Sequence, residues 1–219
     1  MKKTPIVFMM DYESDCITNQ VRPGLEWVVR GEGVATIKFD GQACLWKDNR
    51  LWKRYDRKLN KKAQWKLDQG ADLDPNDLSI FKTPPEGFVP CEAHPDPVSF
   101  HWPGWVPVSA NDPQDQWHYE ALAHLDQEME EGATYELVGP SFARNIYELS
   151  HHQLWKHGKE VVHLPDRSME ALGKFLSQHN IEGIVFHHPD GKMAKIRRKD
   201  FKLFWVQEDL RHAKRRRSR

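Results

Sequence analysis

The sequence predicts an α+β fold built mainly from antiparallel strands. Segments with strand character dominate, and they come from distant parts of the chain instead of alternating regularly with helices. Helical composition is confined to two stretches, residues 114–131 and residues 168–180. No internal repeat is present. A chain of 219 residues is long enough for one large domain or two small ones, and one domain is the simpler arrangement.

The first half of the chain contains a predicted hairpin. Asp48 and Asn49 form a turn signal between two apolar segments that are typical of strands, so these segments should pair antiparallel. Residues 72–113 are instead rich in proline, aspartate and glycine, with scattered aromatic side chains, which predicts a long ordered loop. The strands expected in this half cover residues 26–29, 34–46 and 51–55.

The second half begins with the expected helix over residues 114–131, which Gly132 separates from a short strand over residues 133–139. Over residues 168–180, apolar side chains recur on one helical face and predict a second helix. Pro189, Asp190 and Gly191 then form a turn signal. The strands expected around and after this turn cover residues 181–188, 192–198 and 201–205.

Charge is balanced over the whole chain but not along it. The 32 lysines and arginines equal the 32 aspartates and glutamates, so net charge alone indicates neither nucleic acid nor a membrane as a partner. From Lys195 onward, however, basic residues greatly outnumber acidic ones. We therefore predict a folded domain over residues 1–205 and a basic tail over residues 206–219, which would bind RNA phosphates or serve as a solubilising end.

The cysteine content and the absence of long apolar runs bear on the compartment. The three cysteines, Cys16, Cys44 and Cys91, are odd in number and widely spaced, which is not typical of a disulfide framework. No apolar run approaches membrane-spanning length, and the first residues lack the features of a signal peptide. We expect a cytoplasmic protein.

The first candidate for chemistry is the sequence Lys38-Phe39-Asp40-Gly41 in an apolar strand. Strand alternation places Lys38 and Asp40 on one face, and glycine at position 41 permits a turn or a close approach. A neutral lysine is a nucleophile toward phosphorus, and nearby cations or a divalent metal would favour that form. The ordinary alternative is a lysine at a strand end that pairs with an aspartate.

Three further motifs follow in order. Glu136 lies between apolar neighbours in Tyr-Glu-Leu-Val-Gly and would accept hydrogen bonds from ribose hydroxyls or hold a metal-bound water. Glu182 precedes an apolar strand and would organise Mg²⁺ on phosphate oxygens. Lys195 and Arg197, two residues apart, share a face that suits a triphosphate. Each motif alone also fits an exposed charged strand residue; their order is far more specific.

The order of lysine, acid, acid and cation pair resembles the covalent nucleotidyltransferase superfamily of ATP-dependent DNA ligases, RNA ligases and mRNA capping enzymes. KFDG looks like its nucleophile motif, YELVG like its ribose-contacting acid, EGIVF like its metal-associated acid and AKIR like its phosphate-binding cations. The superfamily commonly has two lysines in the last motif. This chain has Lys195 and Arg197, which keeps the charge but changes the donor geometry.

A closer resemblance covers most of the chain and is to the animal 5′-to-3′ RNA ligases that adenylylate themselves on lysine. It rests on KFDG, LWKRYDRKLNK, PGWVPV, YELVG and IEGIVFHHPDGKMAKIRR. The match of LWKRYDRK suggests that Arg54, and less directly Arg57, contacts the nucleotide or a 5′-phosphate. Trp155 and His157 are both candidates for the aromatic residue that stacks on adenine. PGWVPV has no chemical role that we can assign.

The resemblance implies an adenylation domain and a three-step RNA ligase reaction that uses ATP and Mg²⁺, with Mn²⁺ as a substitute. Lys38 would be the catalytic nucleophile and would carry AMP to RNA with 5′-phosphate and 3′-hydroxyl ends, as in RNA repair. The implied nucleotide-binding residues are Lys38, Asp40, Gly41, Arg54, Arg57, Glu136, Glu182, Lys195 and Arg197, and Glu136 and Glu182 are the implied metal ligands.

Two alternatives remain open from the sequence. The first is a DNA ligase or an mRNA capping enzyme, both of which are expected to carry an OB-fold. The chain that follows Lys195 is too short for this five-stranded fold, which disfavours both enzymes. A non-catalytic RNA-binding module is the other alternative, and it would never become labelled by ATP. We expect a monomer with no membrane partner.

Overall fold

The computed structural model describes residues 3–11, 13–126, 128–203 and 205, and the predicted basic tail over 206–219 lies outside the described residues. The chain divides into two compact units: one consists mainly of Gly41–Lys156, and the other of Thr4–Asp40 together with residues from His157 onward. Most strands pair antiparallel and the helices are few, which confirms the predicted α+β class. No helix in the described part is long and apolar enough to cross a membrane.

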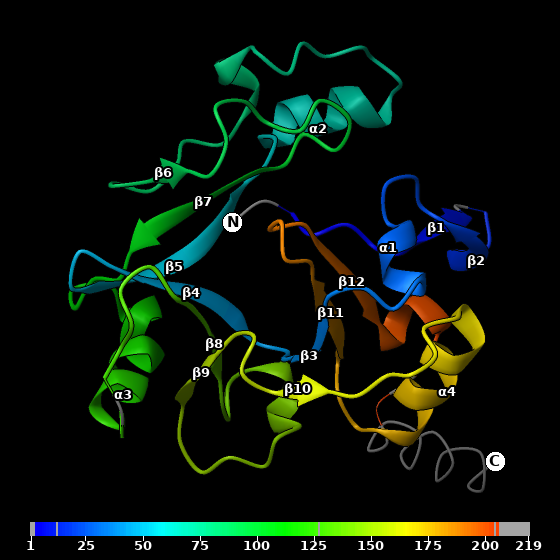
Figure 1. The fold of residues 1–219 in the computed structure, drawn as a ribbon. Coiled ribbons are helices and arrows are strands. Elements are labelled where there is room, and N and C mark those ends of the chain that lie inside the picture. Colours follow the sequence, from blue (N-terminus) through cyan, green and yellow to red (C-terminus); the bar gives the residue numbers. More distant parts are fainter. Residues whose placement is uncertain (1–2, 12, 127, 204, 206–219) are drawn as a thin grey trace, which may run out of the picture. The chain divides into compact units, whose positions relative to one another are not determined.

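The unit over Gly41–Lys156 contains a six-stranded sheet (Figure 1). Every neighbouring pair of strands is antiparallel. The predicted hairpin is confirmed: Asp48 and Asn49 both have a φ of +54°, as a two-residue primed turn requires. In spatial order the strands are β6 (Val89–Pro90), β7 (Trp102–Pro107), β5 (Arg50–Arg57), β4 (Gln42–Lys47), β8 (Thr134–Val138) and β9 (Gln153–Lys156).

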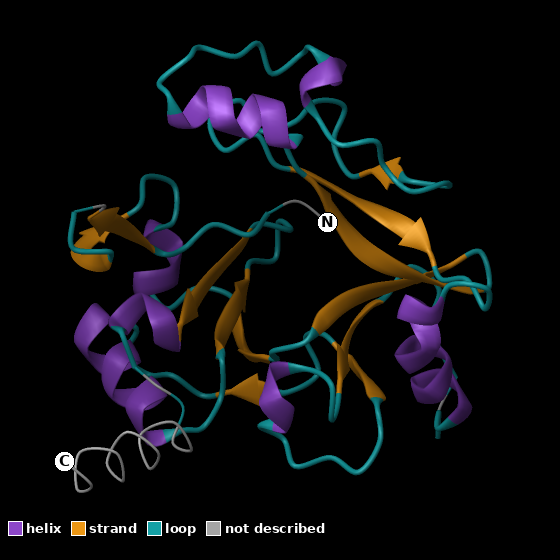
Figure 2. Ribbon diagram, turned by 180° about the vertical axis from the view of Figure 1, so that it is seen from behind, coloured by secondary structure: helices purple, strands orange, loops and turns teal. Residues whose placement is uncertain are grey.

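Two α-helices belong to this unit and pack in separate places. Helix α3 (Gln116–Ala123) covers one face of the six-stranded sheet, where Ala121 joins a core with Cys44 and Leu137. Helix α2 (Lys61–Asp68) follows β5 (Figures 1 and 2). Asn60 caps this helix, because its side chain accepts a hydrogen bond from the backbone N–H of Ala63. The short 3₁₀ helices are η1 (Leu78–Ile80), η2 (Pro113–Asp115) and η3 (Ala143–Asn145).

The other unit contains a four-stranded sheet and a two-stranded sheet. Helix α4 (Met169–Gln178) begins at Ser168, which caps it, and Leu172 and Leu176 are fully buried against the four-stranded sheet. The four-stranded sheet contains, in order, β10 (Val161–Val162), β3 (Val34–Lys38), β11 (Gly183–His187) and β12 (Met193–Arg197). The remaining elements are β1 (Phe8–Asp11), β2 (Cys16–Val21), α1 (Glu26–Val29) and η4 (Arg198–Phe201).

Alternation along the four-stranded sheet creates one apolar and one polar face. Ala35, Ile184 and Ile196 face the core, while Lys38 and Lys195 lie on the other face. The predicted strands over residues 181–188 and 192–198 are therefore confirmed as the hairpin of β11 and β12. This arrangement positions the candidate site.

Three predictions of secondary structure were wrong. Residues 26–29 form helix α1 instead of a strand, because the adjacent Trp27 and Val28 are both buried, which a half-buried strand does not allow. The segment 34–46 contains two strands in different sheets, β3 and β4. Residues 201–203 are not a strand, since η4 ends at Phe201 and Lys202 has a φ of +55°.

Two other predictions were right only in part. The expected loop over residues 72–113 contains the six-residue strand β7, which pairs with β5 along its whole length. The helix expected over residues 114–131 is shorter, because α3 begins at Gln116 and ends at Ala123.

Candidate active site

Lys38 is the last residue of β3, and its ammonium group contacts the carboxylate of Glu182. The same ammonium donates a hydrogen bond to the carbonyl oxygen of Phe39 at 3.1 Å. Both charged side chains are largely buried, with 24% of Lys38 and 19% of Glu182 exposed. The structure therefore brings together two residues that are 144 positions apart in the sequence. The motif order had predicted that both belong to one site.

Lys195 and Arg197 lie on β12, on the same face of the sheet as Lys38. Gly183 of β11 is the direct neighbour of Lys38 on one side and of Arg197 on the other. Burial, together with the positive charges of Arg197 and Lys38, lowers the pKa of Lys195 to about 8, although Glu182 acts in the opposite direction. Lys195 therefore interacts electrostatically with both Lys38 and Glu182.

The guanidinium of Arg197 is held in place by the buried Asp200. Its Nη2 donates to Asp200 Oδ1 at 2.7 Å and its Nε donates to Oδ2 at 3.2 Å. The backbone N–H of Arg197 donates to the same carboxylate at 2.8 Å, so the contact also fixes the start of η4. This ion pair orients Arg197 and offsets part of its charge.

Glycine at position 183 is required by the pairing of β11 with β12. A Cβ atom added there would lie 2.2 Å from the carbonyl oxygen of Ile196 and 2.9 Å from the Cα of Arg197. Any side chain would therefore push apart β11, which Glu182 immediately precedes, and β12, which carries the two cations.

Glu136 and Gly41 belong to the other unit and lie on neighbouring strands. Glu136 is 6% exposed, although it is charged and lies in β8. A Cβ atom on Gly41 would lie 2.1 Å from the carbonyl oxygen of Leu137 and 3.1 Å from Cγ of Glu136, so the backbone beside β4 approaches β8 closely. Asp40 of the first motif is partly buried and is the last residue of the segment Thr4–Asp40, so it belongs to the same unit as Lys38.

The register of the six-stranded sheet places Arg54 on the same face as Glu136 and Trp155. Glu136 lies opposite Trp155 in β9, and Arg54 shares this face by strand alternation. The ring of Trp155 lies 4.8 Å from that of Tyr147. Of the two aromatic candidates, Trp155 is thus the direct neighbour of Glu136, whereas His157 belongs to the other unit.

Arg57 projects from the opposite face of β5 and packs among aromatic side chains. Its guanidinium carbon lies 5.5 Å from the ring centre of Phe81 and 5.2 Å from that of Trp102. Its Nε donates to the carbonyl oxygen of Lys82 at 2.8 Å. These contacts give Arg57 a packing role. Arg54 also packs on an aromatic ring, that of Trp105 at 5.6 Å, but on the face of the sheet that carries Glu136.

Two polar residues on the Lys38 face were not among the predicted site residues. The hydroxyl of Thr36 lies 2.9 Å from Nε2 of His187, and both side chains share this face with Lys38 and Lys195. Burial lowers the pKa of His187, and the neighbouring His157 acts in the same direction. Thr36 could have been predicted from the sequence, because it lies two residues before Lys38 in the same strand and therefore on the same face.

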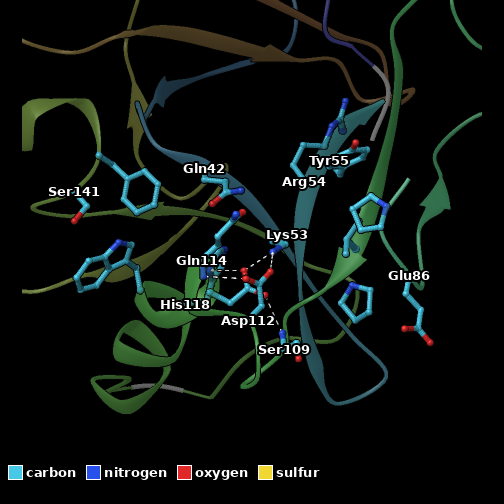
Figure 3. A pocket seen from close by; sticks show the side chains of 16 residues that line it. Gln42, Lys53, Arg54, Tyr55, Glu86, Ser109, Asp112, Gln114, His118 and Ser141 are labelled. Atoms are coloured by element: carbon cyan, nitrogen blue, oxygen red, sulfur yellow. Dashed lines mark hydrogen bonds and ion pairs between the residues drawn. The ribbon is translucent and has the colours of Figure 1, made fainter. Parts of the chain in front are cut away.

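A pocket of about 550 Å³ in the unit over Gly41–Lys156 is lined by Lys53 and Gln42, and Arg54 of β5 also lines it (Figure 3). Burial lowers the pKa of Lys53, but its hydrogen bonds to Asp115 and Asp112 outweigh this effect and the pKa is raised. His118 is buried beside this ion pair, and its two ring nitrogens have no hydrogen-bond partner among the described residues. Residue order does not indicate this cluster, because its acids come from η2 and its N-cap, far from Lys53 in the sequence.

Metal binding has to be considered for both units. Among the described residues, no group of three or more histidine, cysteine, aspartate or glutamate side chains is arranged to hold an ion without other ligands. A magnesium ion that is bound mostly through nucleotide phosphates needs only one or two protein carboxylates. The carboxylate of Glu182, beside Lys38, fits such a role chemically.

Comparisons with known proteins give one consistent result. No protein-family model matches the chain. RNA ligase 1 of Pongo abelii and RNA ligase 1 of Mus musculus are each 30% identical to it over 227 residues, which cover 80% of this chain and 69% of each relative. RNA ligase 1 of Rattus norvegicus is 29% identical over the same span. This chain belongs to the RNA ligase 1 family.

Proposed function

We propose that the protein is an ATP-dependent RNA ligase that joins 5′-phosphate and 3′-hydroxyl RNA ends through a lysyl-AMP intermediate. The observation that carries the proposal is the convergence of Lys38, Glu182, Lys195 and Arg197 around Gly183 in the four-stranded sheet. The names of the relatives support the RNA ligase class. The covalent mechanism is our inference from the motifs and from this geometry.

The reaction would consist of three phosphoryl transfers. In the first, Nζ of Lys38 bonds to the α-phosphorus of ATP while the bond to the departing pyrophosphate breaks. In the second, an oxygen of the RNA 5′-phosphate attacks the same phosphorus and Lys38 is released. In the third, the 3′-hydroxyl of the other end attacks the activated 5′-phosphorus, a phosphodiester forms and AMP leaves. Charge stabilisation and in-line placement dominate such reactions.

The contact with Glu182 has a direct consequence for the first step. An amine attacks phosphorus only in its neutral form, so Lys38 has to lose a proton and leave its ion pair with Glu182. Magnesium bound with the triphosphate would neutralise phosphate charge and compete with Lys38 for this carboxylate. Mn²⁺ would serve in the same place.

Lys195 and Arg197 would bind the triphosphate. Their position on the same face of the sheet as Lys38 supports this proposal, because positive charge beside the attacking lysine would stabilise the phosphate charge. Lys195 supplies a point charge, whereas Arg197 supplies a guanidinium that Asp200 already orients.

For the six-stranded sheet we propose nucleotide contacts by Glu136 and Arg54, which share one face. A buried carboxylate at position 136 would accept hydrogen bonds from ribose hydroxyls or bind a second metal ion. Asp40 and Gly41 would contribute to nucleotide binding through the first motif, and Arg57 would contribute only indirectly, through packing.

The proposal is tested by sealing assays with end-labelled strands and Mg²⁺. The wild-type protein should join RNA ends in the presence of ATP, and Lys38→Met should not. That variant should still seal a strand that already carries AMP on its 5′-phosphate, because Lys38 acts only in the first two steps. Lys192→Met, which changes an exposed lysine next to β12, is the matched control and should seal normally.

The same assay separates the alternatives. Sealing of nicked DNA in preference to RNA would make the protein a DNA ligase, and covalent labelling by GTP instead of ATP would favour capping chemistry. If the folded wild-type protein binds RNA but neither seals it nor becomes labelled by ATP, the protein is an RNA-binding module and the proposal is wrong.

A further inference from the structure

The outward face of α2 carries an exposed tryptophan beside two lysines. Ala63 and Leu67 face the small core beneath the helix, and Trp65 lies on the opposite side by helical periodicity. Lys61 and Lys62, four and three residues before Trp65, lie on the same outward surface. We call these three residues, Lys61, Lys62 and Trp65, the α2 face.

Trp65 is 63% exposed, unlike the buried Trp27, Trp102 and Trp105. Within the described part of the chain, its ring makes no aromatic contact or hydrogen bond. Leaving so large an apolar surface in water contributes nothing to folding. An exposed tryptophan is therefore available to a ligand that can stack on it.

The two lysines occupy positions that do not favour the helix. They are the first two residues of α2 after the Asn60 cap, and no acidic residue is present in the first turn. The positive end of the helix dipole repels cations at this place. Neither lysine has an ion-pair or hydrogen-bond partner among the described residues. Their charge thus faces solvent at a cost to helix stability.

The third lysine of the helix provides a useful contrast. Lys66 lies near Asp77 and lowers the pKa of that carboxyl together with the larger effect of Ser79. Its charge is thus partly offset within the protein, and it lies away from the outward centre of the helix. The positive charge on the outward side of α2 thus comes from Lys61 and Lys62, although the exposed Asp68, which accepts a hydrogen bond from Gln64, lies on the same side.

We propose that the α2 face binds single-stranded RNA, with a base stacked on Trp65 and neighbouring phosphates held by Lys61 and Lys62. The proposal rests on the proposed RNA ligase function and extends it to a place for the RNA strand. An exposed aromatic ring next to positive charge is the combination that binds single strands without reading their sequence. Helix α2 directly follows β5, the strand that carries Arg54 (Figure 1).

The two kinds of contact predict different effects, which a binding titration separates. Anisotropy of a fluorescently labelled oligouridylate would be measured in the absence of ATP at several salt concentrations between about 50 and 200 mM. Trp65→Ala should weaken binding by about tenfold without changing the salt dependence, since stacking is not ionic. Trp65→Phe should recover most of the affinity.

The double variant Lys61→Gln/Lys62→Gln should change the salt dependence instead. Two lost phosphate contacts should reduce the slope of log K against log salt by about 1.4 for a single strand. The matched control, Lys47→Gln/Lys66→Gln, removes two exposed lysines of the same unit that already lie near carboxylates, and it should reduce the slope far less. The melting temperature of the Lys61/Lys62 double variant should not fall, because the variant loses two cations that the positive end of the helix dipole repels.

Three results would overturn the proposal: unchanged affinity in Trp65→Ala, equal loss of slope in both lysine double variants, or self-association that disappears in Trp65→Ala while RNA binding stays normal. The last would make the α2 face a protein interface. Covalent labelling by ATP is measured in the same variants and should remain normal. Wild-type protein that binds RNA through this face but never becomes labelled would contradict the ligase proposal and leave the binding face intact.

Discussion

Substitution of Lys195 by arginine should make nucleotide binding insensitive to pH in the alkaline range. In the free protein, burial and neighbouring cations lower the pKa of Lys195 to about 8, so this side chain loses its charge as the pH rises through that value. The sign follows directly: a neutral Lys195 attracts the triphosphate less, and affinity should fall as the pH increases. Arginine stays charged over this range.

The magnitude follows from the charged fraction. With a pKa of about 8, about 90% of Lys195 is charged at about pH 7 and about 10% at about pH 9. If only the charged form binds the triphosphate, the apparent dissociation constant rises by about tenfold over this interval, since it scales inversely with the competent fraction. Lys195→Arg should show a change of less than about twofold.

The measurement is a calorimetric titration with Mg²⁺ and α,β-methylene-ATP, whose α–β bridge Lys38 cannot cleave. Lys192→Arg, on an exposed lysine of the same hairpin, serves as the control and should keep the pH dependence of the wild type. A wild-type affinity that is constant between these pH values, or a parallel loss in Lys195→Arg, would refute the assignment of Lys195 to the triphosphate.

Three further substitutions test other parts of the account. Gly183→Ala should lower the free energy of unfolding by about 1 to 3 kcal/mol in urea titrations, because its Cβ would lie 2.2 Å from a carbonyl oxygen of β12; an unchanged midpoint would contradict the close approach. Arg57→Ala should lose about 1 to 2 kcal/mol of stability and keep adenylylation, whereas Arg54→Ala should show the reverse; equal effects on adenylylation would argue against their opposite faces. Asp115→Asn should destabilise the protein by about 3 kcal/mol, since Lys53 would lose a buried partner, and a change below about 1 kcal/mol would show that Asp112 suffices.

Local patterns predicted the strands that form the candidate active site. The hairpin of β11 and β12 could be found because a short apolar run, residues 184–186, is typical of a buried strand and a Pro-Asp-Gly turn separates it from the next strand. Strand β8 was found in the same way, from one carboxylate between apolar neighbours. These strands carry Glu136, Lys195 and Arg197, and Glu182 immediately precedes β11. The motif order thus also identified Glu182, Lys195 and Arg197 as residues that lie close to Lys38 in one unit.

Elements that depend on distant partners could not be found from local patterns. Strand β7 contains Pro103 and Gly104, which are typical of loops, yet its pairing with β5 and β6 decides its structure. Gly104 is needed there because the ring of Phe88 would lie 2.2 Å from an added Cβ atom. Helix α1 was missed because four residues are too few to show a helical period.

Arg54 and Arg57 show what the sequence could have decided without a structure. Residues three apart in a strand lie on opposite faces, so both arginines could not project into one site from β5. The Lys53 cluster and the α2 face are different: the first depends on acids from a distant loop, and the second on which side of α2 is covered. Neither is visible from residue order.

The most direct test of the central claim is the site of covalent AMP. Purified wild-type protein and Lys38→Met would be incubated with Mg²⁺ and α-³²P-labelled ATP, denatured, and digested with trypsin for mass spectrometry. We expect label on the denatured wild-type chain, AMP on the peptide that contains Lys38, no label in Lys38→Met and normal labelling of Lys192→Met. A folded wild-type protein that takes up no label, or AMP attached to a residue other than Lys38, would contradict it.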